Sequence, residues 1–176
     1  GDWSSDVCSS DLDQRGGILL PCWVDLHTHL DKGHIWPRTP NPDGTFAGAM
    51  AAVPQDAHRY WTEEDLYRRM SFGLECSYAH GTYGVRTHLD SAGELGLRTW
   101  RVFRSLRREW QGRIELQGVA LVPPDYYFAP EAEALWETIA ENDGILGGVF
   151  TSTPQLERSL DRLFAVAKTW QFPLDL

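Results

Sequence analysis

The sequence predicts an α/β protein that forms part of an eight-stranded (β/α) barrel, with about four βα units and the start of a fifth strand. Segments with strand patterns alternate with segments of helical periodicity at a spacing of about 30 residues, which is typical of βαβ units on a parallel sheet. A complete barrel usually needs about 250 residues, so the 176 residues of this chain correspond to roughly half of one. An open, doubly wound sheet fits the same alternation, and the pattern alone does not choose between the two.

The first residues differ from the rest of the chain. Residues 1–12 (GDWSSDVCSSDL) are polar and have no hydrophobic periodicity, so residues 1–17 are expected to be a non-native or disordered tail. Residues 18–176 are expected to form the N-terminal part of the barrel.

The first unit begins with a short apolar run at residues 18–26 (ILLPCWVDL), which predicts a buried strand. The polar stretch that follows, residues 32–55, is rich in glycine and proline and predicts a long loop. Loops of this length in compact domains are often functional. Trp36 and Phe46 lie on it, so we expect them to wall a substrate pocket.

The second unit is a helix followed by a strand. Thr62 is placed to cap the helix, Glu63 and Glu64 suit the positive end of its dipole, and Gly81 is placed to end it. One apolar stripe recurs at every fourth residue, formed by Leu66, Met70, Leu74 and Tyr78. Residues 83–90 (YGVRTHLD) then alternate between apolar and polar side chains, which is the periodicity of a strand.

The remaining units repeat this order. Each predicted helix carries an apolar face, and each predicted strand is a short apolar run. Helices are expected at residues 93–111, at 130–142 and from Thr153-Pro154 onward, with strands at 114–122 and 145–150 and the opening of a fifth strand at 173–176.

Composition excludes several classes of protein. Asp and Glu total 25 against 16 Lys and Arg, a net charge of −9, which argues against a nucleic-acid partner. No run of about 18 apolar residues is present to span a membrane, and no secretory signal is seen. The three cysteines are widely spaced, as in reduced cytosolic proteins. We therefore expect a cytoplasmic protein with no membrane or nucleic-acid partner.

The sharpest motif is Asp25-Leu-His27-Thr-His29 at the end of the first strand. Alternate residues of a strand share a face, so His27 and His29 project the same way and can converge on one metal ion. Two histidines can also simply end a strand, but the apolar strand before them and the βα repeat after them favour a metal site at the mouth of a barrel. Asp25, on the same face but deeper, is expected to be a supporting acceptor or a structural residue.

A second polar cluster lies on the strand at residues 83–90. Arg86, His88 and Asp90 alternate with apolar residues and should point into the barrel. Arg86 and Asp90 are expected to be paired or hydrogen-bonded, because buried charges need partners. His88 is a candidate catalytic residue that either contacts substrate or supports a metal ligand, and Asp90 is a candidate pocket residue. Lys32 is either a catalytic lysine that stabilises an anionic intermediate or a surface lysine.

Three segments together resemble one known family. Residues 20–32 (LPCWVDLHTHLDK), 41–48 (NPDGTFAG) and 85–90 (VRTHLD) are similar to the cytosine deaminase-like branch of the amidohydrolase superfamily. The resemblance runs from about residue 18 to the last residue. D-x-H-x-H is shared by much of the superfamily, whereas H-T-H-L-D-K with a later R-T-H-L-D is far more specific to this branch.

The resemblance implies a (β/α)8 barrel that binds one divalent metal ion, zinc or iron. It implies hydrolytic removal of an amino or alkylamino group from a small heterocycle such as a pyrimidine or triazine, and a homo-oligomer is compatible with it. His27 and His29 fall on the family's metal ligands of the first strand. The family's next ligand and its proton-shuttling glutamate would lie beyond Leu176, so the resemblance implies that this chain alone is an inactive N-terminal fragment. The family's cytosine-reading glutamine has no counterpart near Val122-Pro123, which weakens cytosine itself as the substrate.

Two other functions stay open. A cyclic-amide hydrolase of the dihydroorotase kind accounts equally well for the His-x-His motif. A non-catalytic α/β domain that binds a ligand at its strand ends is the second alternative, although no glycine-rich phosphate loop follows the first strand.

Overall fold

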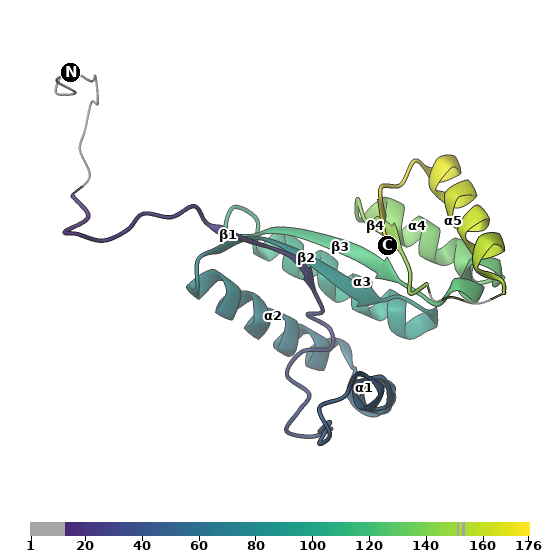
Figure 1. Cartoon of the computed structure of the whole chain (residues 1–176), viewed down its shortest axis with the longest axis horizontal. Helices are drawn as coiled ribbons and strands as arrows, with labels where there is room; N and C mark the ends of the chain where they lie inside the picture. Colours follow the sequence, from purple (N-terminus) through teal and green to yellow (C-terminus); the bar gives the residue numbers. More distant parts are fainter. Residues whose placement is uncertain (1–12, 151, 153) are drawn as a thin grey trace, which may run out of the picture.

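One parallel sheet organises the molecule (Figure 1), which the computed structural model describes for residues 13–150, 152 and 154–176. Its strands lie in chain order, and they are β1 (Trp23–Thr28), β2 (Thr82–Asp90), β3 (Glu115–Leu121), β4 (Ile145–Gly147) and β5 (Leu174–Asp175). A doubly wound sheet reverses its strand order at a switch point, whereas a barrel adds each strand beside the previous one. The observed order therefore confirms the predicted partial barrel.

The curvature of the sheet is visible in one contact between strands that are not neighbours. The Arg86 Nη1 atom on β2 lies 2.8 Å from Asp175 Oδ2 on β5, and His88 Nε2 lies 3.3 Å from Asp175 Oδ1. In a flat sheet, strands three places apart are separated by about 14 Å. Since the short His88 side chain reaches Asp175, the sheet curls toward its inner face.

Helices cover the outer face of the sheet. They are α1 (Phe46–Tyr60), α2 (Glu63–Ala79), α3 (Gly93–Glu109), α4 (Ala132–Glu141) and α5 (Leu156–Trp170), with a short 3-10 helix, η1 (Pro124–Phe128). In Figure 1, α2 and α3 run along the β1–β3 part of the sheet, α4 and α5 lie near β4, and α1 stands apart below the strands. Within the described residues, no helix has the length and apolar character needed to span a membrane.

Helix α2 follows the predicted pattern. The Thr62 hydroxyl accepts a hydrogen bond from the Asp65 backbone N–H at 3.1 Å, which caps the helix. Leu66, Met70 and Leu74 are fully buried, whereas the fourth member of the predicted stripe, Tyr78, is half exposed. The helix stops before Gly81, whose φ of +83° favours glycine.

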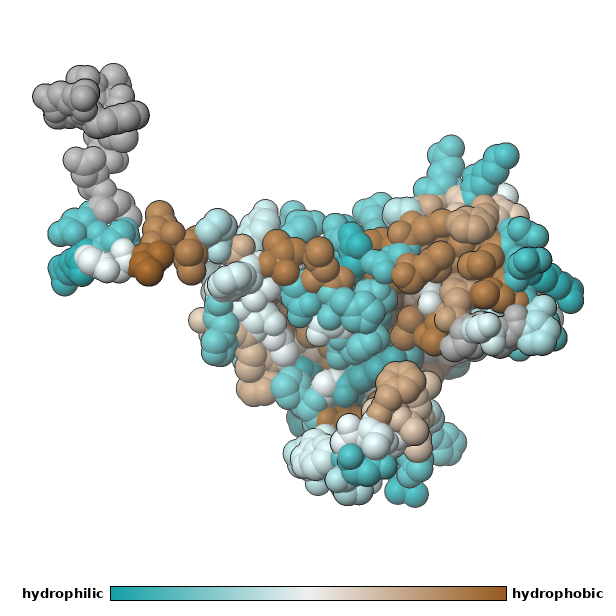
Figure 2. Space-filling model, in the orientation of Figure 1, coloured by the Kyte–Doolittle hydropathy of each residue, from teal (hydrophilic) through white to brown (hydrophobic). Residues whose placement is uncertain are grey.

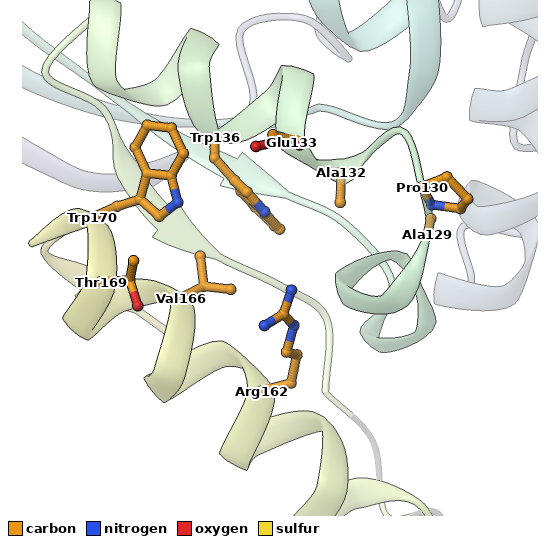
Figure 3. A pocket seen from close by; sticks show the side chains of 9 residues that line it. All are labelled: Ala129, Pro130, Ala132, Glu133, Trp136, Arg162, Val166, Thr169 and Trp170. Atoms are coloured by element: carbon orange, nitrogen blue, oxygen red, sulfur yellow. The ribbon is translucent and has the colours of Figure 1, made fainter.

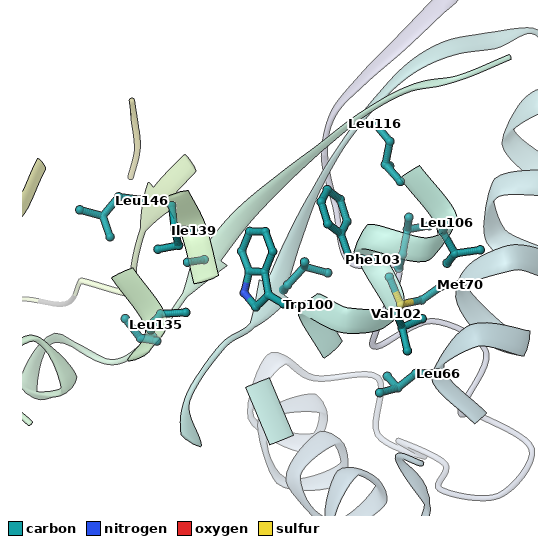
Figure 4. Packing of buried hydrophobic residues seen from close by; sticks show 14 of the residues in the cluster. Leu66, Met70, Trp100, Val102, Phe103, Leu106, Leu116, Leu135, Ile139 and Leu146 are labelled. Carbon is teal, nitrogen blue, oxygen red and sulfur yellow. The ribbon is translucent and has the colours of Figure 1, made fainter. Parts of the chain in front are cut away.

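The core lies between the sheet and helices α2, α3 and α4. Figure 4 shows Val102 and Leu106 of α3 facing Met70 of α2, while Trp100 points toward Ile139 of α4. The aromatic rings of α3 lie so close to β3 that a Cβ atom on Gly118 would be 2.9 Å from Phe103 Cζ. Glycine at this position therefore allows helix and sheet to approach.

Some sequence predictions are wrong in detail, and the strand expected at residues 145–150 ends at Gly147. Residues 46–55 were predicted as loop but are helical, because the Thr45 hydroxyl caps α1 by accepting from the Gly48 N–H at 2.9 Å. The first strand was predicted to be buried, but it is exposed along most of its length because it lies at the edge of the sheet and pairs only with β2. It also begins later, at Trp23. The predicted helix start at Thr153 and the predicted tail up to Leu12 lie outside the described residues.

Candidate metal centre and substrate cavity

A cavity of about 520 Å³ opens at the carboxyl ends of the strands. The ends of β1 and β2 contribute polar side chains, and helix α1 together with the segment after β4 contributes apolar ones. Its lining consists of His27, His29, Lys32, Phe46, Ala49, Met50, Val53, Pro54, His88, Asp90, Leu121, Gly148, Val149, Phe150, Asp175 and Leu176.

A second cavity, of about 350 Å³, lies in the outer helical layer (Figure 3). Glu133 and Trp136 of α4 face Arg162 and Val166 of α5 across it. It contains none of the residues that the sequence singles out. Barrel enzymes place their chemistry at the carboxyl ends of the strands, so we take the first cavity as the candidate site.

His27 and His29 lie together at the end of β1, with ring centroids 5.2 Å apart and ring planes at 83°. Two imidazoles that bind one tetrahedral ion through bonds of about 2.1 Å hold their centroids roughly 5 Å apart. The two rings therefore have the separation that a shared metal ion requires. The Asp25 carboxylate accepts a hydrogen bond from the His27 backbone N–H at 3.1 Å.

The orientation of His29 is fixed by a backbone contact. Its Nδ1 atom lies 3.0 Å from the His88 carbonyl oxygen, so Nδ1 carries the proton and Nε2 is left free as a ligand atom. This arrangement is typical of metal-binding histidines. Burial, and next the positive charge of Lys32, lower the pKa of His29, which favours the neutral imidazole that binds metals.

His88 packs directly on the histidine pair. Its ring is stacked on His27 with centroids 3.9 Å apart, and its Nε2 atom contacts Asp175. Its Nδ1 atom is buried without a hydrogen-bond partner, and burial lowers its pKa. His88 therefore packs against the pair and lines the cavity.

Arg86 and Asp90 each have a charged partner, as expected, although they do not pair with each other. Arg86 instead donates to Asp175 and, through Nε, to the Gln117 side chain at 3.0 Å. Asp90 pairs with Lys32, with 2.8 Å between Nζ and Oδ1. Curling of the sheet brings Asp175 of β5 over β2, so the nearest carboxylate to Arg86 comes from across the barrel. Although burial opposes it, hydrogen bonds from Arg86 and His88 lower the pKa of Asp175.

Asp31 is a residue of this site that the sequence analysis did not identify. Its side chain is fully buried, and its Oδ2 atom accepts from the Asp90 backbone N–H at 2.8 Å. Burial, and next the neighbouring Asp90, raise the pKa of Asp31 to about 7. Asp31 thus joins the turn after the histidine pair to the end of β2. Its position directly between His29 and Lys32 in H-T-H-L-D-K was the signal available in the sequence.

The two aromatic residues predicted to wall the pocket lie in different places. Phe46 lines the cavity, whereas Trp36 does not and is 59% exposed. Phe46 shares its face of α1 with Met50 and Val53, residues that the sequence analysis did not single out. Their helical spacing in the sequence was the signal that could have found them.

A complete metal site is not formed within the described residues, since no three His, Cys, Asp or Glu side chains gather there in a suitable arrangement. The chain therefore offers two imidazole ligands. Such a pair fits one part of a site whose other ligands come from elsewhere.

No protein-family model matches this chain. Two curated proteins that resemble it are a deaminase and an amidohydrolase. A pterin deaminase of Rhizobium rhizogenes (strain K84 / ATCC BAA-868) is 42% identical over 169 residues, which cover 93% of this chain and 38% of that protein. An N-isopropylammelide isopropyl amidohydrolase of Pseudomonas sp. (strain ADP) is 26% identical over 180 residues, covering 94% of this chain and 43% of that protein. The chain thus spans about two fifths of the length of these curated relatives.

Solved structures show the same likeness. The N-isopropylammelide isopropylaminohydrolase of Burkholderia multivorans ATCC 17616 matches with a TM-score of 0.72 and 28% identity, over 96% of this chain and 45% of that one. The 5-methylcytosine deaminase of Klebsiella pneumoniae, at 23% identity, shares the fold with a TM-score of 0.74 over 88% of this chain and 38% of that one. The resemblance predicted from the motifs is confirmed: along nearly all of its length, this chain is similar to part of the barrel of deaminases and amidohydrolases of the amidohydrolase superfamily.

Proposed function

We propose that this chain forms the N-terminal part of a metal-dependent hydrolase that removes an amino or alkylamino group from a small nitrogen heterocycle. The observation that carries the proposal is the His27–His29 pair, whose centroids lie 5.2 Å apart at the mouth of the cavity. The names of the relatives, deaminases and amidohydrolases, support this reaction class.

His27 and His29 would hold one divalent ion, zinc or iron. The free Nε2 atom of His29 and the lowered pKa of its ring suit this role. When bound, such an ion supplies Lewis-acid activation of a water molecule at neutral pH.

The other residues of the cavity would bind and orient the substrate. Phe46, Met50 and Phe150 offer apolar side chains, against which a planar ring can pack with exclusion of water. The Lys32–Asp90 pair, at 2.8 Å, offers a donor and an acceptor for the polar edge of the heterocycle. His88, held at Nε2 by Asp175, would face the substrate or steady His27.

The substrate class that we favour is a pterin, pyrimidine or triazine. The pterin deaminase shares 42% of its aligned residues with this chain, against 26% for the isopropylammelide hydrolase. A cavity of about 520 Å³ is large enough for one fused-ring heterocycle. The cysteines at positions 22 and 76 are free, which supports a cytoplasmic setting.

A chimaera tests the activity directly. Residues 18–176 would replace the matching part of the Rhizobium rhizogenes pterin deaminase, and ammonia release would be measured with a pterin, an aminopyrimidine, an aminotriazine and a cyclic amide. We expect metal-dependent ammonia release from the pterin or another amino-heterocycle, and its loss in a chimaera carrying His29→Ala. We expect no turnover by the 176-residue chain alone, because the part of it that the structure describes offers two imidazole ligands and no third.

The same panel separates the alternatives. Ring opening of the cyclic amide without ammonia release would favour the dihydroorotase-like reaction. A folded, metal-loaded chimaera that turns over none of the four compounds would contradict the proposal and favour a non-catalytic domain.

A further inference from the structure

Helix α1 forms one wall of the candidate cavity but is weakly attached to the rest of the fold. Of its 15 residues, only Ala52, Asp56 and Ala57 are buried. Figure 1 shows it below the strand ends, away from the layer formed by α2 and α3. Its apolar side chains at the cavity are largely exposed, with Phe46 at 79% and Met50 at 55%. Hydrophobic burial alone therefore does not fix its position.

A buried carboxylate anchors α1 instead. The Asp56 side chain is fully buried and accepts hydrogen bonds from Arg38 Nε at 2.8 Å and Arg38 Nη2 at 2.7 Å. The Thr39 hydroxyl, at 2.7 Å, and the Trp61 indole N–H, at 2.9 Å, complete its coordination. Four donors on one carboxylate define a single geometry for this part of the helix.

Hydrogen bonds and ion pairs also connect Arg38 to the turn after the histidine pair. Arg38 also pairs with Asp65 of α2, which in turn accepts from Arg69 Nε at 2.9 Å. Arg69 then donates to the carbonyl oxygens of Asp31 and, at 3.0 Å, of Gly33. Arg38 therefore lies at the centre of a continuous set of charged hydrogen bonds between the cavity wall and the residues that follow His29.

We infer that Arg38 is a positioning residue that holds the α1 wall of the cavity against the turn following His27 and His29. This inference rests on the proposed function only where it describes α1 as a wall of the substrate cavity. Removal of Arg38 leaves the buried Asp56 carboxylate without its cationic partner, which is strongly unfavourable. Because the histidine pair is fixed by strand β1 and the His88 carbonyl, loss of Arg38 should release α1 without displacing the metal ligands.

Hydrogen–deuterium exchange on the 176-residue chain tests this inference, with Arg38→Met compared to the unchanged protein. We expect exchange of α1, residues 46–60, to rise roughly tenfold or more while α3, residues 93–109, changes by less than about twofold. Arg38→Lys, which keeps the charge but not the forked donor, should give an intermediate effect. Zinc binding to the histidine pair, measured by calorimetry, should be unchanged.

Arg101→Met is the matched control, because Arg101 also bridges two carboxylates, Glu63 and Glu94, but is 50% exposed. It should leave the exchange of α1 unchanged. Asp56→Asn, which removes the buried charge itself, should reproduce the local loosening of α1.

Two outcomes would overturn the inference. In the first, α1 keeps its protection in Arg38→Met and Asp56→Asn; in the second, α1 and α3 lose protection together, as expected of a residue that serves only global stability. If the chimaera with the pterin deaminase shows no metal-dependent turnover, the proposed function fails while the exchange result still decides the role of Arg38.

Discussion

The outer and inner sides of the curled sheet differ in how completely their apolar side chains are buried. On the outer side, Leu66, Trp100 and Phe103 are completely buried between α2, α3 and the strands. On the inner side and at the strand ends, Phe46 and Leu176 remain 79% and 63% exposed, and Figure 2 shows hydrophobic surface in brown along the segment before β1 and around the C-terminal strands. Stability therefore comes mainly from the outer layer, which leaves the inner side free to carry the site.

Polar groups are buried on both sides of the sheet. Beneath the helices, the Trp100 indole N–H donates to Ser91 Oγ at 2.9 Å, and Ser91 donates to the Leu89 carbonyl. Around the cavity, buried atoms of Asp31 and His88 have no hydrogen-bond partner. Among the described residues, other such atoms lie away from the cavity, on Asn41, Arg69 and Trp110, so unsatisfied polar groups do not mark the site by themselves.

The largest expected effect lies in the outer layer. Trp100→Ala should lower the free energy of unfolding by about 3–5 kcal/mol, because it leaves a cavity and removes the indole N–H that donates to the Ser91 oxygen. Trp36→Ala, at a site that is 59% exposed, should change it by less than about 0.5 kcal/mol. Urea unfolding measures both. Equal losses for the two tryptophans would break the distinction between the layers.

A smaller effect, dependent on pH, is expected at the rim. Burial opposes ionisation of Asp56, but hydrogen bonds from Arg38, Thr39 and Trp61 outweigh it and lower its pKa below the ordinary 3.8. A carboxyl group with a lowered pKa in the native state contributes stability above pH 3.8, and that contribution is lost as the pH falls through the native pKa.

Asp56→Asn should therefore cost about 1–3 kcal/mol near pH 7 and progressively less toward about pH 2.5, as measured by urea unfolding across this range. Asp161→Asn, at an exposed residue of α5, is the control and should follow the unchanged protein. If the penalty of Asp56→Asn is the same at both ends of the range, the Asp56 charge does not anchor α1.

Much of the fold was predictable because local patterns and tertiary packing agree. The Thr62 cap and the Leu66–Met70–Leu74 stripe define α2 without reference to other segments. Helix α1 was missed because Gly48 and Pro54 weaken its local signal. Its position depends on Arg38 and Asp56, an interaction between loop and helix that no periodicity reveals.

The site was predictable only where one strand determines it. His27 and His29 share a strand, so their spacing alone brings them together. Asp175 contacts Arg86 and His88 only because the sheet curls across three strands, and the raised pKa of Asp31 depends on its burial. Contacts between segments far apart in the chain produce no recognisable residue spacing, so they could not be predicted from the sequence.

The claim that His27 and His29 bind one ion is tested most directly by titrating the purified chain with zinc in a calorimeter. We expect one zinc per chain, with the Kd raised about tenfold or more by either His27→Ala or His29→Ala. His80→Ala, which removes an exposed histidine bonded to the Cys76 carbonyl, should leave the Kd unchanged. Zinc binding of undiminished affinity in both His27→Ala and His29→Ala would contradict the shared metal site.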